Sequence, residues 1–199
     1  MMHPDTRLKW ISDQKGFGVV ATAFIPKATI TWVQDELDIV LPPEKPGELH
    51  PYTAELCEKY SFRNRDGEYI LCWDIAKYIN HSFNSNCLSS AYNFEVAIRD
   101  IAPGEELTDD YGYLNLTEAF IPEDEGVRRK IVKPDDILEY YKEWDAALEP
   151  LFPQLLKLEQ PLFTLLSTEV KLEVENVGRG KKKMLSTKYL YYQPEKSRI

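Results

Sequence analysis

The segment that decides the fold is Y-I-N-H-S-F-N-S-N-C, at residues 78–87. Asparagine and serine side chains dominate it, and such side chains can bond to nearby backbone groups and build a turn. Asn80 also offers an amide that donates and accepts, and His81 offers ring and backbone groups, so the pair could hold a small polar ligand. The residues alone leave both interpretations open.

Two further segments stand on either side of it. Gly16-Phe17-Gly18 is typical of a turn, and the dinucleotide-binding fingerprint is not met because no helix is indicated after it. The other segment is R-D-I-A-P-G-E-E-L-T-D-D-Y-G, at residues 99–112. Tyr111 and Tyr113 alternate, which predicts that they share one face of a strand. A buried tyrosine is usually a core residue with a satisfied hydroxyl.

Taken in order, the three segments resemble the SET-domain protein lysine methyltransferases over about residues 9–115. The resemblance implies a mainly β fold, a SET-type β-clip of short twisted strands. In that fold the second and third segments come together in a knot-like, threaded arrangement. The implied activity is S-adenosylmethionine-dependent methyl transfer to the lysine ε-amine of a protein substrate, with S-adenosylhomocysteine as the product.

The resemblance also assigns residues to the site. The backbone around Gly16–Gly18 would hold the methionine end of S-adenosylmethionine, Asn80 and His81 would bind its amino-acid and adenine parts, and Tyr111 matches the catalytic tyrosine. The implied cofactor-binding residues are Lys15, Gly16, Phe17, Gly18, Tyr78, Asn80, His81 and Tyr111. The implied lining of the substrate channel is Tyr113, Ser89 and Phe83, with Ser89 near the place where some members carry an aromatic residue that limits the number of methyl groups added.

The sequence departs from the family pattern at three points. Ser85 replaces a proline of the Asn-His-Ser segment, and Asp109 stands where many members have an aromatic or aliphatic residue. The cysteine-rich zinc segment that follows many SET domains is missing: the three cysteines are scattered and form no C-x-x-C. We therefore expect no metal. Residues after Thr117 either close the channel or form a helical cap that only completes the core. The aromatic candidates there are Tyr140, Tyr141 and Trp144.

Composition narrows the partners. The 199 residues carry a net charge of −9, and the distribution is uneven. Residues 171–199 hold eight Lys or Arg against three Asp or Glu, which leaves −14 on residues 1–170. An acidic chain is a poor match for a nucleic-acid backbone and a good match for a basic protein substrate. The sequence shows no membrane-spanning stretch and no secretory signal, so we expect a cytoplasmic protein, or a nuclear one in a eukaryote.

Hydrophobic patterning predicts two parts, a SET domain over residues 1–116 and a partly helical extension over 117–199 that packs on it. Strands are expected at 19–21, 29–33, 69–74 and 91–99, with a short helix over 53–60. A helix capped by Asp135 or Asp136 would place Ile137, Tyr141, Trp144 and Leu148 on one face. A second short helix is expected through 155–158, residues 163–177 fit either a helix or a strand, and residues 189–192 resemble a strand.

Two other functions remain compatible with the sequence. One is a SET-fold module that binds a protein and transfers nothing. The other is a methyltransferase that acts on a small molecule.

Overall fold

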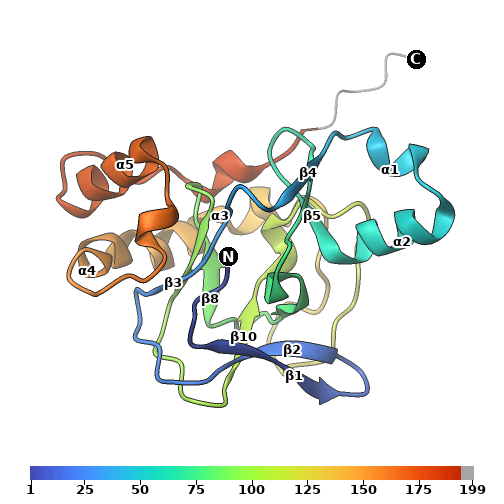
Figure 1. Ribbon diagram of the computed structural model, residues 1–199, viewed down its shortest axis with the longest axis horizontal. Coiled ribbons are helices and arrows are strands. Elements are labelled where there is room, and N and C mark those ends of the chain that lie inside the picture. The colour runs from blue at the N-terminus through green and yellow to red at the C-terminus, as the bar shows by residue number, and fades with distance from the viewer. Residues whose placement is uncertain (194–199) are drawn as a thin grey trace.

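The computed structural model describes residues 1–193, and it shows three small sheets followed by a group of helices (Figure 1). The first sheet has the strand order β1-β2-β10-β7. Its strands are β1 (Thr6–Ser12), β2 (Gly16–Ala21), β10 (Glu106–Asp109) and β7 (Asn80–His81). The β1–β2 and β2–β10 pairs are antiparallel, whereas β10 and β7 run parallel. This sheet therefore joins all three sequence segments that suggested the function.

The other two sheets are antiparallel and three-stranded. One consists of β3 (Ile30–Val33), β9 (Phe94–Ala97) and β8 (Cys87–Ser89), with β9 in the middle. The other consists of β4 (Ile39–Leu41), β6 (Tyr69–Leu71) and β5 (Ser61–Arg63), with β6 in the middle. The helices α1 (Lys45–Glu48) and α2 (Pro51–Tyr60) lie beside the second of these. Two 3-10 turns, η1 (Ile75–Tyr78) and η2 (Tyr111–Tyr113), connect the sheets to the site.

The C-terminal part is helical. It contains α3 (Asp136–Leu148), η3 (Glu149–Leu151), α4 (Phe152–Leu155), η4 (Phe163–Leu165), α5 (Thr168–Gly178) and η5 (Thr187–Leu190). The expected face of α3 is buried at Ile137, Trp144 and Leu148. The ambiguous stretch 163–177 is mostly helix, because the Ser167 side chain accepts the backbone N–H of Val170 at 3.2 Å and so caps α5. No helix within residues 1–193 combines the length and the apolar character that crossing a bilayer requires.

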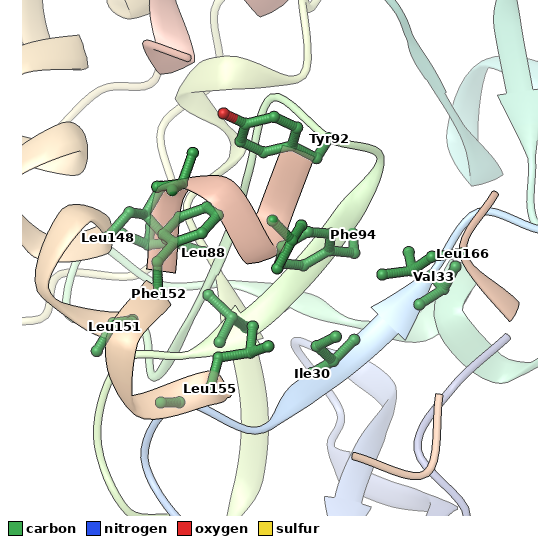
Figure 2. Packing of buried hydrophobic residues seen from close by; sticks show 14 of the residues in the cluster. Ile30, Val33, Leu88, Tyr92, Phe94, Leu148, Leu151, Phe152, Leu155 and Leu166 are labelled. Carbon is green, nitrogen blue, oxygen red and sulfur yellow. The ribbon is translucent and has the colours of Figure 1, made fainter. Parts of the chain in front are cut away.

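One hydrophobic core is shared by the sheets and the helices (Figure 2). Leu88 and Phe94 come from the sheet β3-β9-β8, and Leu148 and Phe152 come from the C-terminal helices. All four are buried, and burying a side chain of this size is worth about 1.5–3 kcal/mol. A second core lies under the first sheet, where Val19 and Leu107 are fully buried. The expected mainly β fold with an α-rich extension is confirmed, while the boundary at residue 116 stays a prediction.

Several local expectations were wrong. Gly16-Phe17-Gly18 is not a turn but the start of β2, paired with β1 at Ser12, Trp10 and Lys9. The strand β1 itself was missed. Tyr111 and Tyr113 do not share a strand face, because the Asp110 side chain accepts the Gly112 N–H at 2.9 Å and starts a 3-10 turn there.

Two expectations near the C-terminus were also wrong. Residues 189–192 do not form a strand: Ser186 caps a 3-10 turn over Thr187–Leu190 by accepting the Lys188 N–H at 3.2 Å. The short helix expected through 155–158 lies earlier, at Phe152–Leu155. It begins next to η3, so the chain continues from α3 with only a change in helical pitch.

Candidate active site

The parallel pairing of β10 with β7 brings the Asn-His-Ser segment beside the Tyr111 segment. Thr108 is opposite Asn80, and Asp109 is opposite His81. The Asn86 side chain fixes the return of the chain, because it accepts the Thr108 N–H at 2.8 Å and donates to the Glu106 carbonyl at 2.7 Å. Some polar residues of 78–87 therefore build the turn. Asn80 and His81 lie beside Lys15–Gly18 and Glu106, and we call this group of residues the platform.

Asn80 connects this platform to β2. Its side-chain nitrogen donates to the Phe17 carbonyl at 3.1 Å and to the Glu106 carboxylate at 2.7 Å. A Cβ added at Gly18 would lie 2.8 Å from that nitrogen and 2.5 Å from the Glu106 carboxylate, so any larger residue here would have to displace these side chains. Lys15 contacts the same Glu106 carboxylate, and its Nζ lies 3.3 Å from Oε2. Five of the predicted cofactor residues are thus close together: Lys15, Gly16, Phe17, Gly18 and Asn80.

His81 is buried and neutral. Burial, and then the charge of Arg129, lower the pKa of His81 to about 4. Its Nδ1 accepts the backbone N–H of Tyr111 at 3.2 Å, so the neutral ring carries its proton on Nε2. That Nε2 is buried and has no hydrogen-bond partner. The ring packs against Phe83 and Phe120, with centroids 4.5 and 5.5 Å apart.

Tyr111 is held at both ends. Its backbone N–H is bound by His81, and its hydroxyl donates to the carbonyl oxygen of Ile79. Burial, and then the nearby Asp109 carboxyl, raise the pKa of Tyr111 well above its usual value. The phenol therefore stays protonated at neutral pH.

Tyr111 also lines a cavity of about 150 Å³. Aromatic and apolar side chains make up much of its wall, from Trp32, Tyr60, Phe62, Cys72, Ala76, Ile79, Leu114 and Leu116. Polar groups reach it from Ser89, Glu95 and Asp109, while Glu58, Lys59 and Lys77 also line it. Tyr111 is therefore part of the wall of a narrow, largely apolar space.

The predicted channel residues do not all reach this cavity. Ser89 does, but Tyr113 is buried behind it, and its hydroxyl accepts the Ser89 N–H at 2.9 Å. Tyr113 lines a neighbouring cavity of about 40 Å³. Phe83 lines a different cavity of about 690 Å³, together with Tyr140 and Trp144. Tyr78, a predicted cofactor residue, packs edge-on against Phe17, with ring centroids 6.1 Å apart.

The aromatic residue of the extension that reaches the site is Phe120, which the sequence analysis missed. Its ring lies 5.5 Å from His81 and 6.0 Å from Tyr111, and a two-bond bridge to Val132 holds its backbone. The three expected candidates lie elsewhere. Trp144 packs against Tyr113, Tyr140 lies under the Arg129 guanidinium, and Tyr141 lies beside Lys188.

Arg129 was also missed, and it joins the extension to the site. Its guanidinium bonds to the carboxylates of Asp110 and Asp136, and it lies over the rings of Phe83 and Tyr140. In the sequence it belongs to Arg128-Arg129-Lys130, which reads as an ordinary exposed charge run. Glu95 gave a better signal, because it is a single charged residue within the apolar run of β9.

In a comparison with known protein families, the SET domain model matches residues 16–112. Residues 16–112 are a SET domain. The matched region begins at the first residue of β2 and ends one residue after Tyr111, so it contains the assembled platform. SET domains are methyltransferase domains that generally use S-adenosylmethionine. Among residues 1–193, no three His, Cys, Asp or Glu side chains cluster in a way that could hold a metal ion.

Other comparisons add little to this. No curated protein sequence matches the SET-domain chain. One solved structure that resembles it is that of a proposed histone methyltransferase from Plasmodium falciparum. The identity is 17% and the TM-score is 0.41, over 55% of this chain and 95% of that one.

Proposed function

We propose that this SET-domain protein transfers a methyl group from S-adenosylmethionine to the ε-amine of a lysine in a protein substrate. The observation that carries the proposal is the position of Tyr111. It contacts His81 of the platform, and it also lines the 150 Å³ cavity. With the cofactor on the platform and the lysine side chain in the cavity, the two reactants would meet at Tyr111.

The residues of the platform suit S-adenosylmethionine. The methionine end of the cofactor carries a carboxylate and an ammonium group, and the platform offers Lys15 and Glu106 as opposite charges beside Gly16–Gly18. The unpartnered Nε2–H of His81 supplies a buried donor for a polar edge of the cofactor. When bound there, the cofactor would supply an electrophilic methyl on a sulfonium sulfur.

The residues of the chain orient this reaction. The protonated Tyr111 hydroxyl and the Ile79 carbonyl present oxygen atoms that can accept weak C–H···O contacts from a polarised methyl, or N–H contacts from an amine. Holding two reactants in line is worth about 7–11 kcal/mol in well-oriented systems. Positioning therefore accounts for most of the rate increase that we ascribe to the site.

The cavity suits an aliphatic side chain that ends in a cation. Its walls are aromatic and apolar, as a methylene chain requires, and rings such as Trp32 and Tyr60 can stabilise a cation near their faces. The net charge of −9 favours association with a basic protein. The lining includes Lys59 and Lys77 as well as Glu58, so the attraction comes from the whole acidic body and not from the rim.

The test begins with cofactor binding. Calorimetric titration with S-adenosylmethionine and S-adenosylhomocysteine should show saturable binding, and the absence of binding to either would overturn the proposal. Lysine peptide arrays and a small-molecule mixture are then incubated with methyl-labelled cofactor. Labelled lysine peptides support the proposal. If the cofactor binds but no substrate becomes labelled, the result favours a SET-fold module that binds a protein and transfers nothing. Label confined to small molecules favours a methyltransferase that acts on a small molecule.

A further inference from the structure

Two carboxyl groups meet inside the cavity that Tyr111 lines. Glu95 comes from the centre of the sheet β3-β9-β8, and Asp109 from the end of β10. Both residues line the cavity and are almost fully buried, with exposures of 2% and 5%, and the Glu95 carboxyl helps to raise the pKa of Asp109. The Thr31 hydroxyl donates to Glu95 at 2.7 Å, and the Asp110 N–H donates to Asp109 at 2.9 Å. The pair is therefore fixed by Thr31 on β3 and by the backbone directly after β10.

The pair has no counter-cation of its own. Within residues 1–193 no ion pair includes Glu95 or Asp109. The titratable groups facing it are Cys72, Cys87 on β8, and Asp110 and Tyr111 beyond the end of β10. The charged residues Glu58, Lys59 and Lys77 line the same cavity. Two neighbouring carboxyl groups cannot both ionise at low cost, and burial raises the pKa of each. With one proton on the pair, a single negative charge faces the cavity.

We propose that Glu95 and Asp109 bind the ammonium end of the substrate side chain and accept its proton before methyl transfer. This inference rests on the proposed function for the identity of the substrate. It assigns a base to a reaction that needs a neutral amine. It also explains why Asp109 stands where many members of the family have an aromatic or aliphatic residue.

The proton balance is simple. An ammonium group enters and gives one proton to the free carboxylate, which leaves a neutral amine beside a pair that now holds two protons. The amine lone pair then forms the N–C bond while the S–C bond breaks, and the electron pair of that bond stays on sulfur. The positive charge passes to the methylated amine, and the pair releases its extra proton to water after the product leaves.

Burial makes this proton transfer feasible. An unperturbed lysine has a pKa of about 10.4, far above that of an ordinary carboxyl group. A low-dielectric cavity disfavours both charged forms, so it raises the pKa of a carboxyl and lowers that of an amine. Sharing a proton between Glu95 and Asp109 raises their affinity for protons further. A neutral side chain of the same size gains nothing from the pair, which therefore also selects for amines.

The first experiment measures amine binding without catalysis. The probe is n-butylammonium, with 1-butanol as its neutral counterpart, and both are titrated by NMR into the protein loaded with S-adenosylhomocysteine. The variants are Glu95→Gln and Asp109→Asn, which keep the side-chain shape, and the control is Glu36→Gln at an exposed position. We expect n-butylammonium to bind the wild type and Glu36→Gln equally, and at least tenfold more weakly to either cavity variant, while 1-butanol affinity is unchanged.

The outcomes separate this inference from the proposed function. Equal amine affinity in the wild type and both cavity variants overturns the inference, as does a protein that binds S-adenosylhomocysteine but no amine. If the wild-type protein does not bind S-adenosylhomocysteine, the proposed function is overturned instead. If one variant does not fold, the other gives the same comparison, since each removes half of the pair.

The second experiment detects the shared proton directly. Infrared difference spectra at neutral pH should show the carbonyl stretch of a buried protonated carboxylic acid, and its intensity should rise when n-butylammonium binds. Asp109→Asn should remove the rise. A wild-type spectrum without a protonated carboxyl band, or one unchanged by the amine, would overturn the proton-acceptor role.

Discussion

The indole nitrogen of Trp144 donates a hydrogen bond to the Asp110 carboxylate at 3.3 Å, and so connects α3 to the residue directly before Tyr111. Trp144→Phe should keep most of the packing against Tyr113 and lose this bond. We expect a loss of about 1–2 kcal/mol in the free energy of unfolding, measured by urea titration. The control is Trp73→Phe, which also removes an indole bond to a carboxylate but at an exposed position. Equal losses in the two variants would contradict the prediction.

Arg129 should matter more for stability than its position in a charged run suggests. Arg129→Met leaves the buried carboxylates of Asp110 and Asp136 without their cation, and breaking a buried pair in this way typically costs about 3–5 kcal/mol. The neighbouring Arg128→Met removes the same charge from an exposed position and should change stability little. Thermal or urea unfolding compares the two. Similar stability of both variants would show that Arg129 does not hold the extension to the site.

The sequence predicted the parts of this architecture that have a local pattern, but not the parts that depend on contacts between distant residues. The face of α3 was predictable because Ile137, Trp144 and Leu148 follow the helical period, which is a local signal. The turn at Tyr111–Tyr113 was not, because alternating aromatics also fit a strand, and the decision came from the Asp110 side chain. The pairing of β2 with β10 joins residues 86 and 88 positions apart, and so distant a pairing has no local signature at all.

The candidate site shows the same division. The motif residues Gly18, Asn80 and Tyr111 could be picked out by resemblance, and the structure brings them together. Phe120 and Arg129 lie in a loop whose composition only suggests exposure, so their contacts depend on tertiary structure. Tyr113 is buried, and its hydroxyl accepts the Ser89 N–H, while its place along the substrate channel stays a prediction.

Tyr111→Phe should abolish methyl transfer while leaving cofactor binding nearly intact. Removing the hydroxyl leaves the Ile79 carbonyl unpaired and takes away one oriented oxygen, and losses of a single such group typically cost about 10²–10³ in rate. Transfer of labelled methyl and calorimetric cofactor binding give the two readouts. Tyr92→Phe is the matched control, because its hydroxyl accepts the Leu185 N–H outside the site. Wild-type transfer by Tyr111→Phe would remove this tyrosine from the mechanism.

Gly18→Ala should weaken cofactor binding by displacing Asn80 and Glu106. The new methyl group would lie within 3 Å of both side chains and of Ile11, so at least one must move. We expect a loss of tenfold or more in S-adenosylhomocysteine affinity by calorimetry, which corresponds to about 1.4 kcal/mol. Gly104→Ala is the control: it strains a position with φ of +85° in open space, away from the platform. A similar loss of affinity in both variants would point to general destabilisation.

His81 should make stability depend on pH below neutrality. Because the folded pKa of about 4 lies below the usual 6.5, the unfolded chain binds the extra proton first, and stability falls as the pH drops from 6.5 towards 4. Each pH unit in that window costs about 1.4 kcal/mol, or on the order of 3 kcal/mol in all. His81→Gln removes this titration, so its urea midpoint should fall less steeply over the same range. Parallel slopes for the two proteins would rule out His81 as the source.

The order of the strands in the first sheet has a consequence for biosynthesis. The β1–β2 hairpin is complete within the first 21 residues, but β10, which joins it to the Asn-His-Ser segment, follows only after residue 105. The core that supports the site also needs α3 and α4, which end at Leu148 and Leu155. Contacts between such distant residues form slowly, and domains fold as units during synthesis. Most of the chain must therefore leave the ribosome before Tyr111 reaches its place, and a nascent chain paused before α3 would expose Leu88 and Phe94 to chaperones and proteases.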